Sequence, residues 1–323
     1  MAFCTFAQNY ERMMLRGILS DRPPYNKFLV LVGLCLIGFM TFTMLGTFLA
    51  GAIYGINLLT NPAAIQDFSN PNLILAMKMI QLFSAFGTFL LPPIIAALIF
   101  DQQPKHYLLL DKKLNIQPIL IVIGLMLIMV PFINWMLVVN SGMHLPSFLH
   151  GVEEWMKSSE NNAAVLTEKF MATTSINGLL INLLIIAVLP AISEELMFRG
   201  VIMRLFTELS GNRHVAVFLS AFLFSAIHMQ FFGFFPRFAL GLLLGYLVMW
   251  SGNLKLSMLA HFINNAGAVI LGWFAARKEL SFDQDTLGTT SGDELILAIS
   301  VFGTWVLLFM IYKFYNRVRP EMS

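Results

Sequence analysis

Long runs of apolar residues, separated by short polar connections, dominate the chain. Eight of these runs are long enough to cross a hydrocarbon core of about 30 Å as a helix. In chain order they lie at 28–56, 73–100, 117–140, 176–206, 214–232, 234–250, 254–275 and 295–315. Only a short apolar connection separates the fifth run from the sixth, so seven spans is the alternative count. The pattern predicts an all-α, polytopic membrane helix bundle of about eight transmembrane helices.

The connection between the third and fourth runs has a helical pattern of its own. Apolar residues recur at Phe148, Val152 and Trp155, while Glu153 and Glu154 lie on other faces. Such spacing is typical of an amphipathic helix that lies on a membrane surface. We therefore expect an exterior surface helix near 145–172.

These elements divide the chain into four expected parts. They are a cytoplasmic N-terminal segment (1–27), N-terminal transmembrane helices with the exterior surface helix (28–175), a core of four further runs (176–275), and an exterior loop, last transmembrane helix and cytoplasmic tail (276–323).

Composition and charge agree with a membrane protein. Hydrophobic residues make up 58% of the chain and charged residues 12%, whereas soluble domains have about 25% charged residues. Most lysines and arginines lie in the connections on one side of the expected spans, together with both chain ends. Since positive charge favours the cytoplasm, both termini are predicted to be cytoplasmic. There is no basic block typical of nucleic-acid binding, and Cys4 and Cys35 do not indicate a disulfide framework.

Four ionisable residues lie well inside the apolar runs, where they are costly. They are Glu194, Glu195, His228 and His261. An ionisable group at the bilayer centre costs at least about 2.5–3.5 kcal/mol, so such residues are usually paired and functional. We therefore regard them as candidates for a functional site within the membrane.

Helical spacing connects these residues to neighbours in the sequence. Glu195 lies four residues before Arg199, so the two can form an ion pair, while Glu194 points about 100° away from Glu195. Phe224 lies four residues before His228 in the same way.

On the seventh run, His261 lies four residues before Asn265. Pro190 lies one turn before Glu194 and predicts a kink there.

Two chemistries fit these residues. In the first, Glu194 is a general base that activates water, His228 shares or orients that water, and hydrogen bonds from His261 and Asn265 stabilise the oxyanion. In the second, Glu194, His228 and His261 bind a zinc ion and leave a fourth position for water. The H-E-x-x-H signature of soluble zinc proteases is absent. A metal-free mechanism and a zinc mechanism therefore both stay open.

Three classes of function use such a cluster. An endopeptidase uses such residues to activate water, and a transporter or proton-coupled carrier also uses intramembrane glutamate and histidine. A non-catalytic immunity or scaffold membrane protein is the third alternative. No repeat relates the two halves of the chain, although such repeats are common in carriers.

Three short motifs carry a resemblance to a known family. They are E-E-x-x-x-R at 194–199, F-x-x-x-H at 224–228 and H-x-x-x-N at 261–265. In order, spacing and placement they resemble the CPBP family of CAAX proteases and bacteriocin-processing enzymes, also called Abi-type intramembrane proteases. The resemblance covers roughly 176–275.

The resemblance implies a role for each motif residue. Glu194 and His228 would activate water, His261 and Asn265 would stabilise the oxyanion, and Glu195, Arg199 and Phe224 would support the site. Members are often described as metalloproteases, and their type II prenyl endopeptidases cleave prenylated C-termini. The implied protein is a hydrolase of the bacterial inner membrane, with lipid and a membrane-associated peptide or protein as its partners. Its substrate and oligomeric state do not follow from the sequence.

Overall fold

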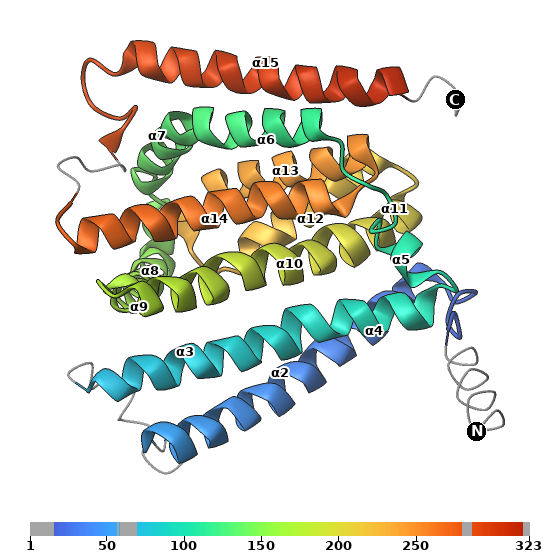
Figure 1. Cartoon of the computed structure of the whole chain (residues 1–323), viewed down its shortest axis with the longest axis horizontal. Helices are drawn as coiled ribbons and strands as arrows, with labels where there is room; N and C mark the ends of the chain where they lie inside the picture. The colour runs from blue at the N-terminus through green and yellow to red at the C-terminus, as the bar shows by residue number, and fades with distance from the viewer. Residues whose placement is uncertain (1–15, 57, 59–69, 280–285, 319–323) are drawn as a thin grey trace. The chain divides into compact units, whose positions relative to one another are not determined.

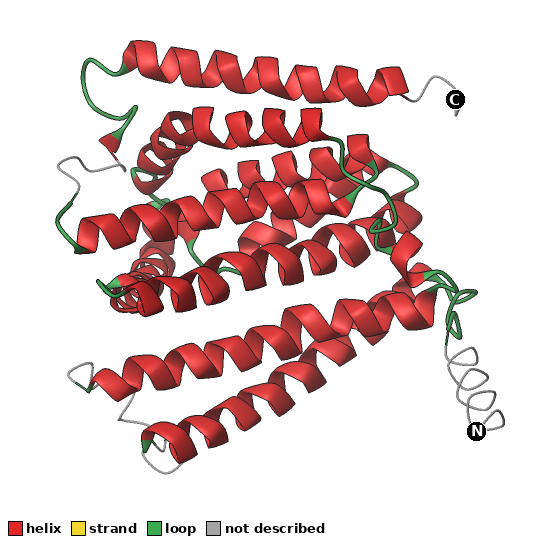
Figure 2. Ribbon diagram, in the orientation of Figure 1, coloured by secondary structure: helices red, strands yellow, loops and turns green. Residues whose placement is uncertain are grey.

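The computed structural model describes residues 16–56, 58, 70–279 and 286–318. Within these residues, every regular element is a helix (Figure 2). Six of these helices are long and apolar enough to cross a membrane, and a bent pair of helices raises the number to seven. The predicted all-α membrane helix bundle is therefore confirmed.

Contacts divide the chain into two units. The first comprises Met1–Lys112 and Ile192–Ala216, and the second comprises Lys113–Ala191 and Val217–Ser323. Each of these units is built from two separate stretches of the chain.

In the first unit, one long helix lies along three shorter helical segments (Figure 1). The long helix is α2 (Pro24–Tyr54), and the segments are α3 (Pro71–Ala85), the π-helical η2 (Phe86–Leu90) and α4 (Leu91–Phe100). The short α5 (Pro104–Tyr107) follows. The backbones approach most closely at Gly38 and Gly87, since a Cβ added to Gly38 would lie 1.9 Å from the Gly87 carbonyl oxygen. Small residues at such a crossing are typical of helix packing in membranes.

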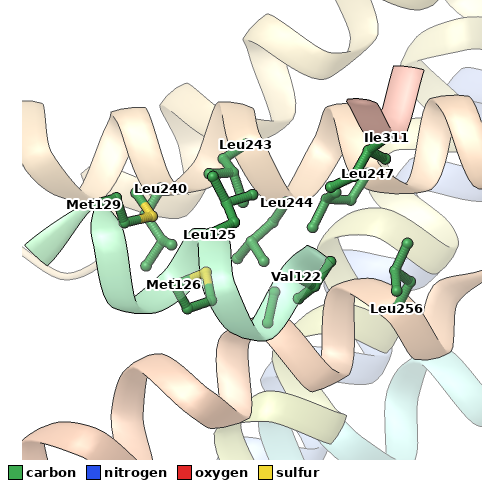
Figure 3. Close-up of a cluster of buried hydrophobic side chains, with 11 residues drawn as sticks. Val122, Leu125, Met126, Met129, Leu240, Leu243, Leu244, Leu247, Leu256 and Ile311 are labelled. Atoms are coloured by element: carbon green, nitrogen blue, oxygen red, sulfur yellow. The ribbon is translucent and has the colours of Figure 1, made fainter. Parts of the chain in front are cut away.

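The second unit contains most of the remaining elements. They are α6 (Ile116–Ile128), α7 (Val130–Ser141), η3 (Ser147–Leu149), α8 (His150–Met171), α9 (Ile176–Asn182), η4 (Leu183–Val188), η6 (Phe231–Gly233), α13 (Phe234–Ser251), α14 (Leu254–Ala276) and α15 (Glu294–Val318). A cluster of buried side chains from α6, α13, α14 and α15 forms its core (Figure 3). Leu125, Leu244 and Leu256 in this cluster are completely buried.

The third expected span is a bent pair, α6 and α7, with an angle of 43° between the two helices. Pro131 lacks the N–H that would continue the helical hydrogen bonds. The side chain of Ser300 inserts between the backbone groups of Ile128 and Phe132. Ser300 Oγ donates to the Ile128 carbonyl at 2.6 Å and accepts from the Phe132 N–H at 3.1 Å. Inserted side chains and prolines are recognised causes of helix kinks. Both the Ile128 carbonyl and the Phe132 N–H therefore have a hydrogen-bond partner at the bend.

Two elements include residues from both units. The helix Ile176–Ser210 continues for 35 residues through Pro190 as one span. It consists of α9, η4, α10 (Leu189–Glu195), η5 (Leu196–Ile202) and α11 (Met203–Ser210). After it, α12 (Arg213–Ala226) has 14 residues. The expected span at 214–232 is thus shorter, because the chain turns after Ala226 with Met229 at a φ of 53°.

The expected surface helix near 145–172 corresponds to α8, which begins at His150 and ends at Met171. Glu153 anchors the start of α8 to the preceding loop. Its Oε1 accepts from Lys157 Nζ at 2.6 Å and lies 2.9 Å from His144 Nδ1, while Oε2 accepts from the Leu145 N–H at 3.0 Å. Only 6% of Glu153 is exposed. Hydrogen bonds from Lys157, His144 and Leu145 lower the pKa of Glu153 from 4.5 to about 2.

This lowered pKa makes the anchor sensitive to acid. The stabilisation is complete above the unfolded-state pKa and is lost as the pH falls from about 5 toward 2. We expect hydrogen exchange at 143–158 to accelerate over this pH range. In the Glu153→Gln variant, exchange should already be faster at neutral pH and should change less with acid.

The neighbouring Glu154→Gln variant is the matched control. Glu154 is 68% exposed and lies 3.7 Å from His150, so this change should leave the exchange profile of the wild type intact. The same acid response in the wild type and in Glu153→Gln would contradict the assignment.

Candidate functional site

The first motif lies where the long helix Ile176–Ser210 changes its winding. Glu194 and Glu195 end α10, and Arg199 lies in the π-helical segment η5. A second π segment, η4, precedes Pro190. Single π turns inside α-helices are rare and often occur at functional sites.

Glu195 and Arg199 form a completely buried ion pair. Arg199 Nη1 donates to Glu195 Oε1 at 2.5 Å, and both side chains are 0% exposed. Glu194 is half-buried and also interacts electrostatically with the guanidinium. Removal of one partner from a buried pair costs about 3–5 kcal/mol, because the other charge remains without compensation. The pair expected from the spacing is therefore present and fixes the helix next to Glu194.

His228 follows the last turn of α12 and has a defined tautomer. Its Nδ1 lies 2.7 Å from the Phe224 carbonyl oxygen, while its backbone N–H donates to Ser225 at 3.3 Å. A carbonyl oxygen can only accept, so Nδ1 carries the hydrogen. In the neutral ring, Nε2 then has the lone pair that can accept a proton or a hydrogen bond. In its neutral form, the half-buried His228 side chain can therefore accept a hydrogen bond at Nε2.

Phe224 brings the two histidines together. Its ring centroid lies 5.1 Å from that of His228 and 5.9 Å from that of His261, and both contacts are edge-to-face. Phe224 is 2% exposed and His261 is 3% exposed. Edge-to-face aromatic contacts are worth about 0.5–1.5 kcal/mol each. The phenylalanine of the second motif therefore positions the imidazole rings of both the second and the third motif.

Asn265 compensates for a missing backbone hydrogen bond. Pro190 has no N–H, so it cannot donate to the carbonyl four residues earlier, which belongs to Ile186. Asn265 Nδ2 donates to this Ile186 oxygen at 3.0 Å, and Asn264 Nδ2 donates to Asn265 Oδ1 at 3.1 Å. One of the two N–H groups of the Asn265 amide thus holds α14 against η4. This contact was missed in the sequence, although Pro190 itself was a signal that the Ile186 carbonyl needs another donor.

The candidate residues belong to two units. Glu194, Glu195 and Arg199 lie in the first unit, while Phe224, His228, His261 and Asn265 lie in the second. Within the described part of the chain, no three His, Cys, Asp or Glu side chains form a group that could hold a metal. The zinc set Glu194, His228 and His261 includes residues of both units and stays a prediction.

The candidate residues lie in a multi-pass helical membrane protein, and comparisons with known proteins show what part of this chain is similar to. Residues 176–267 match the family model of the type II CAAX prenyl endopeptidase Rce1-like proteins. This segment contains all three motifs. The resemblance to CAAX proteases is therefore confirmed for this part of the chain.

A curated relative supports a more limited comparison. A segment of 119 residues is 28% identical to the uncharacterized protein YpbD of Bacillus subtilis (strain 168). It covers 36% of this chain and 56% of YpbD, which is less than two thirds of that protein. No solved structure matches the chain.

The compensation of Pro190 by Asn265 can be tested with a double-mutant cycle. We expect Asn265→Ala to destabilise the protein by about 1–2 kcal/mol, as for other interhelical hydrogen bonds in membranes. In a Pro190→Ala background, the restored N–H can donate to Ile186, so the same change should cost less. Thermal unfolding in detergent measures both differences.

Asn264→Ala is the control, since Asn264 lies on the same helix and donates to Asn265 rather than to Ile186. Its effect on thermal unfolding should be the same with or without Pro190. An equal loss for Asn265→Ala in both backgrounds would refute the compensation.

Proposed function

We propose that this chain is an intramembrane endopeptidase that hydrolyses a peptide bond of a membrane-associated peptide or protein. The match to the Rce1-like family supports a CAAX-type intramembrane protease in general. The observation that carries the mechanism is the fixed tautomer of His228, whose Nδ1 donates to Phe224. This arrangement orients Nε2 as an acceptor for water.

In the proposed mechanism, Glu194 takes a proton from a water molecule, and His228 Nε2 accepts the other hydrogen of that water in a hydrogen bond. The water oxygen attacks the scissile carbonyl carbon, and the negative charge moves to the carbonyl oxygen. His261 and the second N–H of Asn265 donate hydrogen bonds to this oxyanion. When the C–N bond breaks, the proton on Glu194 passes to the leaving amine, so the products are a carboxylic acid and an amine.

The buried Glu195–Arg199 pair has a supporting role in this proposal. It holds the helix that carries Glu194, and the guanidinium interacts electrostatically with the Glu194 carboxylate. An ionised carboxylate is the form that can accept a proton from water.

We further propose a cell-membrane location with both termini in the cytoplasm. The proposal rests on the excess of lysine and arginine in the connections on that side. The catalytic residues would then act on substrates within the bilayer, and lipid would surround the protein.

Replacement of Glu194 tests the mechanism. We expect Glu194→Gln to reduce cleavage at least about a hundredfold, since general acid–base catalysis typically contributes 10²–10⁴-fold. Mass spectrometry of membrane peptides incubated with purified protein in liposomes measures the products.

The control is Glu168→Gln, because Glu168 is exposed on α8 and lies outside the motifs. This variant should cleave the same peptides as the wild type. Full activity of Glu194→Gln would refute the general-base role. A protein that cleaves none of these peptides but moves protons or solutes across the liposome membrane would instead be a carrier.

Metal analysis tests the metal-free form of the mechanism. We expect purified protein to contain much less than one equivalent of zinc, and we expect cleavage to survive dialysis against a chelator. Elemental analysis and the liposome assay give the two measurements. Stoichiometric zinc that is lost together with activity, and that restores activity when added back, would show that a metal is required.

A further inference from the structure

A groove opens between the start of α6 and the end of α15, which lie side by side within the second unit (Figure 1). Its volume is about 820 Å³, within the range of about 300–1,000 Å³ that is common for ligand sites. Apolar walls come from Leu120 and Ile121 on α6 and from Phe309 and Met310 on α15. The groove therefore offers an apolar slot along the membrane-spanning part of both helices.

The packing of the two helices explains why the groove opens at this end. Near the other end of α6, a Cβ on Gly303 would lie 2.3 Å from Ile128 Cδ1, so the helices approach closely there. One turn further along, Gly124 faces Leu307. Beyond these glycines, the residues that line the groove on both helices have large side chains. The groove thus lies between the close contact at Gly303 and the end of α15.

Two cations line the groove on the last turns of α15. Lys313 and Arg317 are four residues apart, so they share one face of α15 and both line the groove. Phe309 lies one turn earlier, and Lys313 Nζ lies 5.8 Å from the centroid of its ring. None of the described residues that line the groove is acidic. The groove is thus apolar along its length and positive at its mouth.

The two cations lie at one end of the membrane-spanning part of α15. The apolar span of α15 runs from Glu294 to Arg317, so Lys313 and Arg317 occupy its last turns. Basic residues at the ends of spans extend toward the lipid headgroups, and basic pockets between transmembrane helices bind anionic headgroups.

We propose that this groove binds one anionic phospholipid. Lys313 and Arg317 hold the phosphate, Gln117 lies beside the headgroup, and an acyl chain lies along Leu120 and Met310. A free phosphate ion would leave the apolar length of the groove unused, and a zwitterionic lipid would neutralise the two cations less well. Charge complementarity together with the apolar walls therefore selects a lipid with net negative charge.

Lipid titration of the full chain tests the proposal. Purified protein in a neutral detergent is titrated with phosphatidylglycerol, and bound lipid is counted by native mass spectrometry. We expect one tightly bound lipid in the wild type. In Lys313→Gln/Arg317→Gln its affinity should fall by ~30-fold, as expected for the loss of two interfacial charges.

A matched control distinguishes lipid binding in the groove from a general effect of net charge on lipid binding. Lys105→Gln/Arg213→Gln removes the same net charge from two exposed residues outside the groove, and it should bind like the wild type. Leu120→Trp places a larger apolar side chain in the groove without a change in charge. It should weaken lipid binding at least tenfold.

Four results would overturn the proposal. The first is equal binding by the wild type and Lys313→Gln/Arg317→Gln, and the second is equal binding of phosphatidylcholine. The third is displacement of the bound lipid by millimolar inorganic phosphate, which would identify a simple anion site. A loss in the Lys105→Gln/Arg213→Gln control as large as that in the groove variant would likewise show a nonspecific charge effect.

Discussion

In hydrocarbon, every backbone N–H and C=O group needs a partner within the protein, because water is absent. This constraint shapes each irregular point of the second unit. Ser300 bridges the broken ladder between Ile128 and Phe132, and Asn265 supplies the donor that Pro190 cannot give to Ile186. The carbonyl oxygen of Phe224 accepts a hydrogen bond from Nδ1 of the His228 ring. Two of these three side chains belong to the family motifs, so helix integrity and candidate chemistry depend on the same residues.

Much of this arrangement could be predicted from the sequence. Apolar runs located the long helices to within a few residues, and the amphipathic pattern located α8. The cost of charge in lipid selected Glu194, Glu195, His228 and His261, and helical spacing predicted the Glu195–Arg199 pair. The predictions of the helices and of the ion pair succeeded because they depend on hydropathy and on contacts within one helix, which are local properties of the chain. The role of the four ionisable residues in a functional site stays a prediction.

Other features depend on contacts between distant residues. The end of α12 at Ala226 was hidden because apolar residues continue through Phe231 and Phe232. The bend after Met129 involves Ser300, which is remote in the sequence. Phe224 was recognised as a motif residue, but its contact with His261 requires α14 to pack beside α12. The zinc interpretation followed from residue types, and it stays a prediction because ligation requires a specific arrangement of side chains in space.

The π-helical segment η4 has a consequence for how relatives of this chain are compared. A π turn contains one residue more than an α turn, and such turns usually occur singly within α-helices. A relative with an ordinary α-helix here would therefore align with a gap of one residue between Leu183 and Val188. A helical wheel drawn across the gap would misplace all later residues by about 100°. The insertion thus decides which face of the helix presents Glu194, although the residues around it are simple aliphatic ones.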